Sequence, residues 1–307
     1  MIETKELVKR YDDFEAVKGI SFSVKEGELM ALLGPNGAGK TSTIRMVSSI
    51  LVPTSGQILV NGRDTVKEAD QVRRSIGMIT EQPGLYERMS GMEYLLFYGR
   101  LYGLQDKAIR DRGKQLYERF GMKDAIDRRL GGFSKGMKQK VGLIRAMLHN
   151  PPVLLLDEPT SAMDPHSAHQ VRDAIQELGQ DNRAIILTTH NLNEAEKLAD
   201  RIAIISDGEI IAQGTANELR RQLSGDRLME ITCDRPVGMT LEELAAAEFP
   251  DVKIESVEDN LIRYRSKKPI EHNPNMIRFL AGQGVGTVML NEITPSLEEI
   301  YLSIVQS

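Results

Sequence analysis

A phosphate-binding loop is predicted by one run of residues that fits the pattern G-x-x-x-x-G-K-[ST]. The run reads Gly34-Pro35-Asn36-Gly37-Ala38-Gly39-Lys40-Thr41. Apolar residues 29–33 favour a strand before it, and Ser42 opens the helix expected after it. Backbone N–H groups in such a turn can point at one anion, and glycines leave room for the phosphate oxygens. Lys40 would supply charge for the β- and γ-phosphates and the Thr41 hydroxyl would bind Mg²⁺, so we expect a nucleotide-phosphate site.

Two adjacent carboxylates, Asp157 and Glu158, follow the apolar residues 153–156, which favour a buried strand. Ligands bind at the carboxyl ends of the strands in parallel sheets, and both side chains are expected at such an end. Asp157 can hold Mg²⁺, and Glu158 can polarise an attacking water. An acidic pair that merely ends a strand is the alternative, and the phosphate loop makes it the less favoured one.

A second anion-binding segment is predicted around Ser134 and Gly136, which precede a helix expected over 140–148. A hydroxyl, free N–H groups and the helix dipole would meet there. The segment is weak evidence by itself, but its place between the phosphate loop and the carboxylates gives it weight.

Composition limits the classes of function. The chain has 307 residues with 39 basic and 44 acidic side chains, a net charge of -5, and no basic run, which argues against a nucleic-acid partner. The single cysteine, Cys233, excludes an internal disulfide framework and suits a reducing cytoplasm. No apolar run approaches the ~18–20 residues of a transmembrane segment, and no signal peptide is recognised. A membrane role would therefore need a partner.

Strand and helix patterns alternate along most of the chain, which predicts an α/β fold with a mainly parallel sheet covered on both faces. We expect a nucleotide-binding domain over 1–222, with an inserted helical subdomain over about 88–150, and a small α+β accessory domain over 223–307. The accessory domain has the order of a split βαβ arrangement. Its elements are strands over 228–232, 252–257, 261–264 and 286–290, helices over 240–248 and 275–281, and a last helix after 294–296.

The order of these motifs resembles that of the ATP-binding subunit of an ATP-binding-cassette (ABC) transporter. The resemblance covers about residues 1–222 and implies a P-loop NTPase fold with antiparallel β and α-helical subdomains. The segment 295–302 resembles the daunorubicin-exporter-like branch, whose members carry one cassette and pair with a separately encoded permease. The matching motifs are the phosphate loop, Ser134-x-Gly136, Asp157-Glu158-Pro159-Thr160-Ser161, Met163-Asp164 and Thr188-Thr189-His190.

The resemblance implies which residues bind ATP and Mg²⁺. Tyr11 would stack on the adenine, and Gly34–Thr41 together with Ser42 would wrap the phosphates. Thr41 and Asp157 would serve the Mg²⁺ ion.

It also implies how hydrolysis is carried out. Glu158 would be the general base, while His190 would contact the γ-phosphate and hold the attacking water. Ser134 and Gly136 would reach the γ-phosphate of ATP held by a second copy of the chain, so a homodimer would share its two sites. Asp164 would communicate across the dimer interface.

The sequence departs from the family pattern in two places. The usual Leu-Ser-Gly-Gly-Gln signature reads Phe-Ser-Lys-Gly-Met here, with Lys135 at its third position, and we interpret Lys135 and Lys138 as solvated or dimer-facing charges. The family has a metal-contacting glutamine in the loop that corresponds to 80–86. Either Glu81 or Gln82 is the candidate for that position, because one sequence does not decide the alignment. A carboxylate there can still bind Mg²⁺ but adds negative charge beside the γ-phosphate.

The implied function is an ATPase that energises a membrane exporter from the cytoplasmic side, peripheral through its permease. The permease would dock between the helical insertion and the main sheet, near 81–86 and the Tyr94/Tyr98 face. Tyr94, Tyr98 and Tyr102 fall at helical spacing, and core packing is the alternative for them.

Two other functions remain open. A soluble ABC protein acting on ribosomes or DNA is disfavoured by the single cassette and the acidic charge. An ATP-dependent regulatory switch is disfavoured by Glu158 and His190, and mildly favoured by Glu81.

Overall fold

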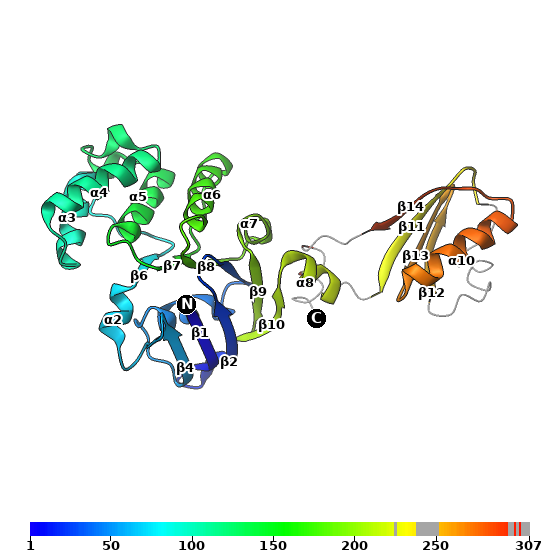
Figure 1. Ribbon diagram of the computed structural model, residues 1–307, viewed down its shortest axis with the longest axis horizontal. Helices are drawn as coiled ribbons and strands as arrows, with labels where there is room; N and C mark the ends of the chain where they lie inside the picture. Colours follow the sequence, from blue (N-terminus) through cyan, green and yellow to red (C-terminus); the bar gives the residue numbers. More distant parts are fainter. Residues whose placement is uncertain (224–225, 238–251, 294–297, 299–300, 302–307) are drawn as a thin grey trace. The chain divides into compact units, whose positions relative to one another are not determined.

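The computed structural model describes residues 1–223, 226–237, 252–293, 298 and 301, the side chains of 221–223 excepted (Figure 1). The chain divides into two compact units, Met1–Ala216 and Asn217–Ser307. Among the described residues, no helix is long and apolar enough to cross a membrane.

The first unit is built on a six-stranded sheet with strand order β10-β9-β3-β8-β7-β6, parallel except for β10 (Figure 1). The central strands β3, β7 and β8 are buried along their whole length, so they read as continuous apolar runs. The strands are β3 (Leu29–Leu33), β6 (Ile76–Ile79), β7 (Val153–Asp157), β8 (Ala184–Thr189), β9 (Arg201–Ser206) and β10 (Glu209–Gly214).

Each face of this sheet has its own hydrophobic core, because successive side chains of a strand point to opposite faces. Leu154 and Leu156 pack with helices α3 to α6, whereas Val153 and Leu155 pack with α1 and a second, antiparallel sheet of order β2-β1-β4-β5. That sheet consists of β1 (Ile2–Tyr11), β2 (Phe14–Val24), β4 (Ser55–Val60) and β5 (Arg63–Asp64). The helices outside the insertion are α1 (Lys40–Val47), α2 (Ala69–Arg74), α6 (Pro165–Gly179) and α7 (Leu192–Leu198).

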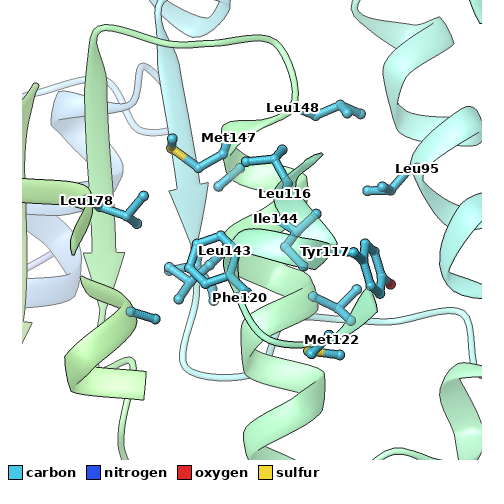
Figure 2. Packing of buried hydrophobic residues seen from close by; sticks show 14 of the residues in the cluster. Leu95, Leu116, Tyr117, Phe120, Met122, Leu143, Ile144, Met147, Leu148 and Leu178 are labelled. Atoms are coloured by element: carbon cyan, nitrogen blue, oxygen red, sulfur yellow. The ribbon is translucent and has the colours of Figure 1, made fainter. Parts of the chain in front are cut away.

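The segment from Gly91 to Met147 is helical, with α3 (Gly91–Leu101), α4 (Asp106–Arg119), two short 3₁₀ turns at Lys123–Ala125 and Leu130–Gly132, and α5 (Lys135–Met147). Ser90 begins α3 with a capping box that also uses Glu93. Figure 2 shows the core of this segment, where Tyr117 and Phe120 pack against Leu143 and Ile144 of α5. The core fixes α5 against both the insertion and the sheet.

The second unit contains a four-stranded antiparallel sheet of order β12-β13-β11-β14 and the helix α10 (Pro269–Gly282). Met229, Ile231 and Tyr264 of the sheet form a core with Met276 and Leu280 of α10. The strands are β11 (Arg227–Cys233), β12 (Val252–Glu258), β13 (Leu261–Ser266) and β14 (Thr287–Ile293), and α8 (Ala216–Leu223) begins where the two units divide.

The helix expected over 240–248 lies outside the described residues, so the split βαβ arrangement stays a proposal. Of the helix expected after 294–296, only Glu298 and Tyr301 are described, and both are helical. The expected start of the helix 275–281 was wrong, because α10 begins at Pro269 and contains Pro274 in its interior. Proline lacks an N–H and normally interrupts a helix, so we expected the helix to begin after Pro274.

His149 follows α5 and is largely buried. Its Nε2 lies 3.1 Å from the carbonyl oxygen of Ile76, and its ring stacks on Tyr102 with centroids 3.9 Å apart. Burial lowers the pKa of His149 to about 4, so the side chain is neutral near pH 7.

This histidine makes stability depend on pH. Between its unfolded pKa of about 6.5 and its folded pKa, the unfolded chain binds more protons than the folded chain. The free energy of unfolding should therefore fall as the pH is lowered from about 6.5, by at most about 1.4 kcal/mol per pH unit from this residue. Urea unfolding at pH 7 and pH 5 should show a smaller fall for His149→Gln, and equal falls would contradict the assignment.

Candidate ATP-binding and hydrolysis site

The phosphate loop connects β3 to α1, and two of its glycines are required by close approaches. A Cβ at Gly34 would lie 2.2 Å from the carbonyl oxygen of Ile205. Gly39 has φ 100° and precedes α1, and a Cβ there would lie 2.4 Å from the carbonyl oxygen of Ala16. A side chain at either position would displace the loop from the neighbouring strands.

Lys40 is 6% exposed and is held across the loop by backbone carbonyls. Its Nζ donates hydrogen bonds to the oxygens of Gly34 at 2.8 Å and Pro35 at 3.1 Å. It also lies 3.3 Å from Glu158 Oε1 in an ion pair without hydrogen-bond geometry. The ammonium therefore joins the phosphate loop to the carboxylate of Glu158, which follows β7.

Asp157 is 5% exposed and has hydroxyl partners. Thr188 donates a hydrogen bond to Asp157 Oδ1 at 2.6 Å, and the Thr41 hydroxyl lies 3.3 Å from the same oxygen. A carboxylate and a hydroxyl side by side are the hard oxygen donors that Mg²⁺ prefers. The donor set that the sequence predicted for Mg²⁺ is thus compatible with that ion.

Glu158 and His190 meet at the carboxyl ends of β7 and β8. His190 Nδ1 lies 2.8 Å from Glu158 Oε2, and the Glu158 side chain is 12% exposed. The backbone of Glu158 has φ 48°, and its N–H is bound to both the carbonyl and the hydroxyl oxygen of Thr188. The carboxylate is fixed between Lys40 and His190, with its oxygens on different partners.

A pocket of about 280 Å³ opens beside the phosphate loop. The Tyr11 hydroxyl lies 3.3 Å from Ser42 Oγ at its edge, and Tyr11 is 41% exposed. Glu81 lines the pocket, whereas Gln82 is not among its lining residues. The lining residues are Tyr11, Phe14, Ala16, Asn36, Gly37, Gly39, Lys40, Thr41, Ser42, Glu81 and Glu158.

Three residues that the sequence singled out lie elsewhere, at the N-termini of two packed helices. Ser134 caps α5 by accepting a hydrogen bond from the N–H of Met137, and Asp164 caps α6 in the same way. Gly136 is close to α6, since a Cβ on it would lie 3.1 Å from the Cβ of Ser167. None of the three lines the pocket beside the phosphate loop.

A family model described as ABC transporter matches residues 17–161. The ABC transporter ATP-binding protein NatA of Bacillus subtilis is 41% identical over 71% of this chain and 91% of its own length. The chain belongs to the ABC transporter family.

Two further similarities extend over more of the chain. The daunorubicin resistance ATP-binding protein DrrA3 of Streptomyces coeruleorubidus is 34% identical over 96% of this chain and 92% of its own length. A solved structure of the ATP-binding subunit of an ABC transporter is 32% identical, with a TM-score of 0.66, and covers 80% of this chain and 98% of that one. The predicted ABC cassette fold and the daunorubicin-exporter-like resemblance are therefore confirmed.

The cassette contains one buried acid that the sequence did not reveal as a site residue. Glu194 is 2% exposed and accepts hydrogen bonds from the hydroxyls of Thr160 and Thr189, each at 2.6 Å. Burial raises the pKa of its carboxyl. Glu194 therefore ties the segment after Glu158 to the segment before His190. An acidic residue in the first turn of a helix is common as a dipole partner, so nothing in the sequence marked it.

Removing this carboxylate should destabilise the cassette. Glu194→Ala leaves two threonine hydroxyls without their acceptor, and the free energy of unfolding should fall by about 1–3 kcal/mol. Glu194→Gln keeps the shape of the side chain and one acceptor oxygen, so its free energy of unfolding should fall by less. Urea unfolding of both variants tests this, and an unchanged stability for the alanine variant would show that the two contacts contribute nothing.

Proposed function

We propose that the chain hydrolyses ATP to ADP and phosphate and thereby energises a membrane exporter. The observation that carries the proposal is the contact of Glu158 with both Lys40 and His190 at the edge of the phosphate-loop pocket. One carboxylate there adjoins both the charge for the phosphates and a side chain able to orient a water molecule.

ATP would lie along the pocket, with its adenine on Tyr11 and its phosphates on residues 34–42. Mg²⁺ would be held by Thr41 and Asp157, with Glu81 rather than Gln82 as the further candidate because only Glu81 lines the pocket. When bound, the ion neutralises charge on the β- and γ-phosphates.

The chain's own residues would then act on water and phosphate. Glu158 accepts a proton from the attacking water as the water oxygen bonds to the γ-phosphorus and the bond to the β-phosphate oxygen breaks. Lys40 stabilises the charge that gathers on the phosphate oxygens. His190 holds Glu158 in place and faces the γ-phosphate from a side chain that is 51% exposed.

A second copy of the chain would complete each site. Ser134 and Gly136, which lie away from the chain's own pocket, would reach the γ-phosphate of ATP held by that copy, and Asp164 would lie at the interface. ATP that binds the closed dimer more tightly than the open one supplies the free energy of coupling.

The permease would dock at a pocket of about 300 Å³ between the helical insertion and the edge of the main sheet. It is lined by Tyr98 and Tyr102 of the predicted tyrosine stripe. Tyr94 does not belong to this surface, because it is fully buried and its hydroxyl bonds to Arg145. This partner would place the cassette on the cytoplasmic side of the membrane.

We infer the direction of transport from the relatives, which include ATP-binding proteins of daunorubicin and doxorubicin resistance. Export of a small molecule by the partner permease is therefore the function that we infer. The regulatory switch, favoured only by the extra charge of Glu81, is the alternative that the next experiment decides.

Glu158→Gln should bind ATP as the unchanged chain does and lose ATP turnover by about 10²-fold or more, because an amide cannot accept the proton. The measurement is steady-state phosphate release together with equilibrium binding of ATP. Glu3→Gln, at an exposed acid on β1 that does not line the pocket, is the matched control. Equal turnover in the Glu158→Gln and unchanged proteins would reject Glu158 as the base and favour the switch.

Ile50 is 62% exposed and lines the proposed docking pocket. Ile50→Glu places a charge in an apolar contact and should reduce co-purification with the permease encoded alongside this chain at least about fivefold. Ile211→Glu is the control, because Ile211 is 39% exposed on β10, at the other edge of the six-stranded sheet. Undiminished co-purification of Ile50→Glu would contradict this docking site.

A further inference from the structure

Lys135, one of three residues that depart from the family signature, contacts the loop after Glu158. Its Nζ donates hydrogen bonds to the carbonyl oxygens of Ser161 and Ala162, both at 2.9 Å. The interpretation of Lys135 as a solvated or dimer-facing charge therefore did not include these two hydrogen bonds within the chain. Lys138, one turn further along α5, is paired with Glu87 at 2.7 Å instead.

The loop that Lys135 contacts is conformationally demanding. Glu158 and Ala162 adopt left-handed φ values of 48° and 50°, which side chains with a Cβ disfavour. Within the loop, the Ser161 N–H donates to the carbonyl oxygen of Glu158 at 3.2 Å. Such a backbone persists only where surrounding contacts over-determine it. Lys135 supplies two of these contacts.

The same loop reaches the nucleotide pocket. The Ser161 hydroxyl donates a hydrogen bond to Glu81 Oε1 at 3.0 Å, and Glu81 lines the pocket beside the phosphate loop. One short series of contacts thus connects Lys135 to Ser161 and then to Glu81. It joins the N-terminus of α5 to Glu81 and to Glu158, the residue at which the loop begins.

We propose that Lys135 is a positioning residue that holds the loop from Glu158 to Met163, and so sets the orientation of Glu158 and Glu81. The inference rests on the proposed ATP hydrolysis and adds a residue to it. Lys135 stands between Ser134 and Gly136, which are proposed to contact ATP of a second copy. Its two hydrogen bonds therefore link contact with one ATP to the hydrolysis geometry at the other. A glycine at this position could not make that link.

The ammonium suits these acceptors better than a neutral donor would. It carries three N–H donors on a long stem, so it can bond two adjacent carbonyls at once. A charged donor also strengthens each hydrogen bond to an uncharged acceptor. Arginine offers the same charge and enough donors, whereas methionine offers similar length and none.

The test compares Lys135→Met and Lys135→Arg with Lys138→Met as the matched control on the same helix. Lys135→Met should lower kcat about three- to tenfold while KM for ATP stays within about twofold, because the loop and not the nucleotide contact is loosened. Hydrogen exchange of the Ser161 and Met163 amides should become faster. Lys135→Arg should restore most of kcat, and Lys138→Met should leave both measurements unchanged.

Each contrary result has a definite meaning. If Lys135→Met keeps the kcat and the hydrogen exchange of the unchanged chain, the proposal is overturned. A raised KM for ATP with unchanged kcat would also overturn it, because Lys135 would then contact the nucleotide and not the loop. If Lys135→Met does not fold, Lys135→Gln carries the same expectations. If the unchanged chain does not hydrolyse ATP, the proposed function fails, and the exchange measurement alone still decides whether Lys135 holds the loop.

Discussion

The ion pair between Lys40 and Glu158 depends on the register of three neighbouring strands. β8 lies between β3 and β7, with Leu33 opposite Thr189 and Asp157 opposite Thr188. The three strands therefore end at one edge of the sheet, where the phosphate loop leaves β3. A one-residue shift of β7 would turn Asp157 to the other face and break the approach of Lys40. The buried apolar strands that hold the sheet together thus also set the distances in the site.

Threonine hydroxyls make it possible to bury so many acids in one place. Asp157 and Glu194 are each at most 5% exposed, and each accepts hydrogen bonds at 2.6 Å from a threonine of β8 or of the loop beside it. A buried carboxylate without such donors would be strongly destabilising. A buried carboxylate also attracts a cation more strongly than an exposed one does, which agrees with our proposal that Asp157 would hold Mg²⁺.

Local sequence predicted the parts of the fold and site that local residues determine. The phosphate loop and the strand before Asp157 both follow from short patterns. The roles of Glu194 and Lys135 could not follow, because each has a partner far along the chain. Thr160 is 34 residues from Glu194, and Ser161 is 26 residues from Lys135. Our proposal of Glu81 rather than Gln82 likewise rests on the pocket wall, which includes only the first of the two. Where a contact spans elements, the side chain's type alone does not say what it meets.

Helix α5 joins the two surfaces that the proposed cycle uses. Ser134 caps its N-terminus, and Arg145 near its C-terminus donates to the carbonyl oxygens of Pro83 and Met78 and to the Tyr94 hydroxyl. Arg145 also lines the proposed docking pocket. Between these ends, Leu143 and Ile144 are fully buried in the core, which holds the middle of the helix in place. A displacement at the docking pocket that we propose would therefore reach Ser134 and Gly136, which we propose to contact the second ATP, as coupling between a permease and a cassette dimer would require.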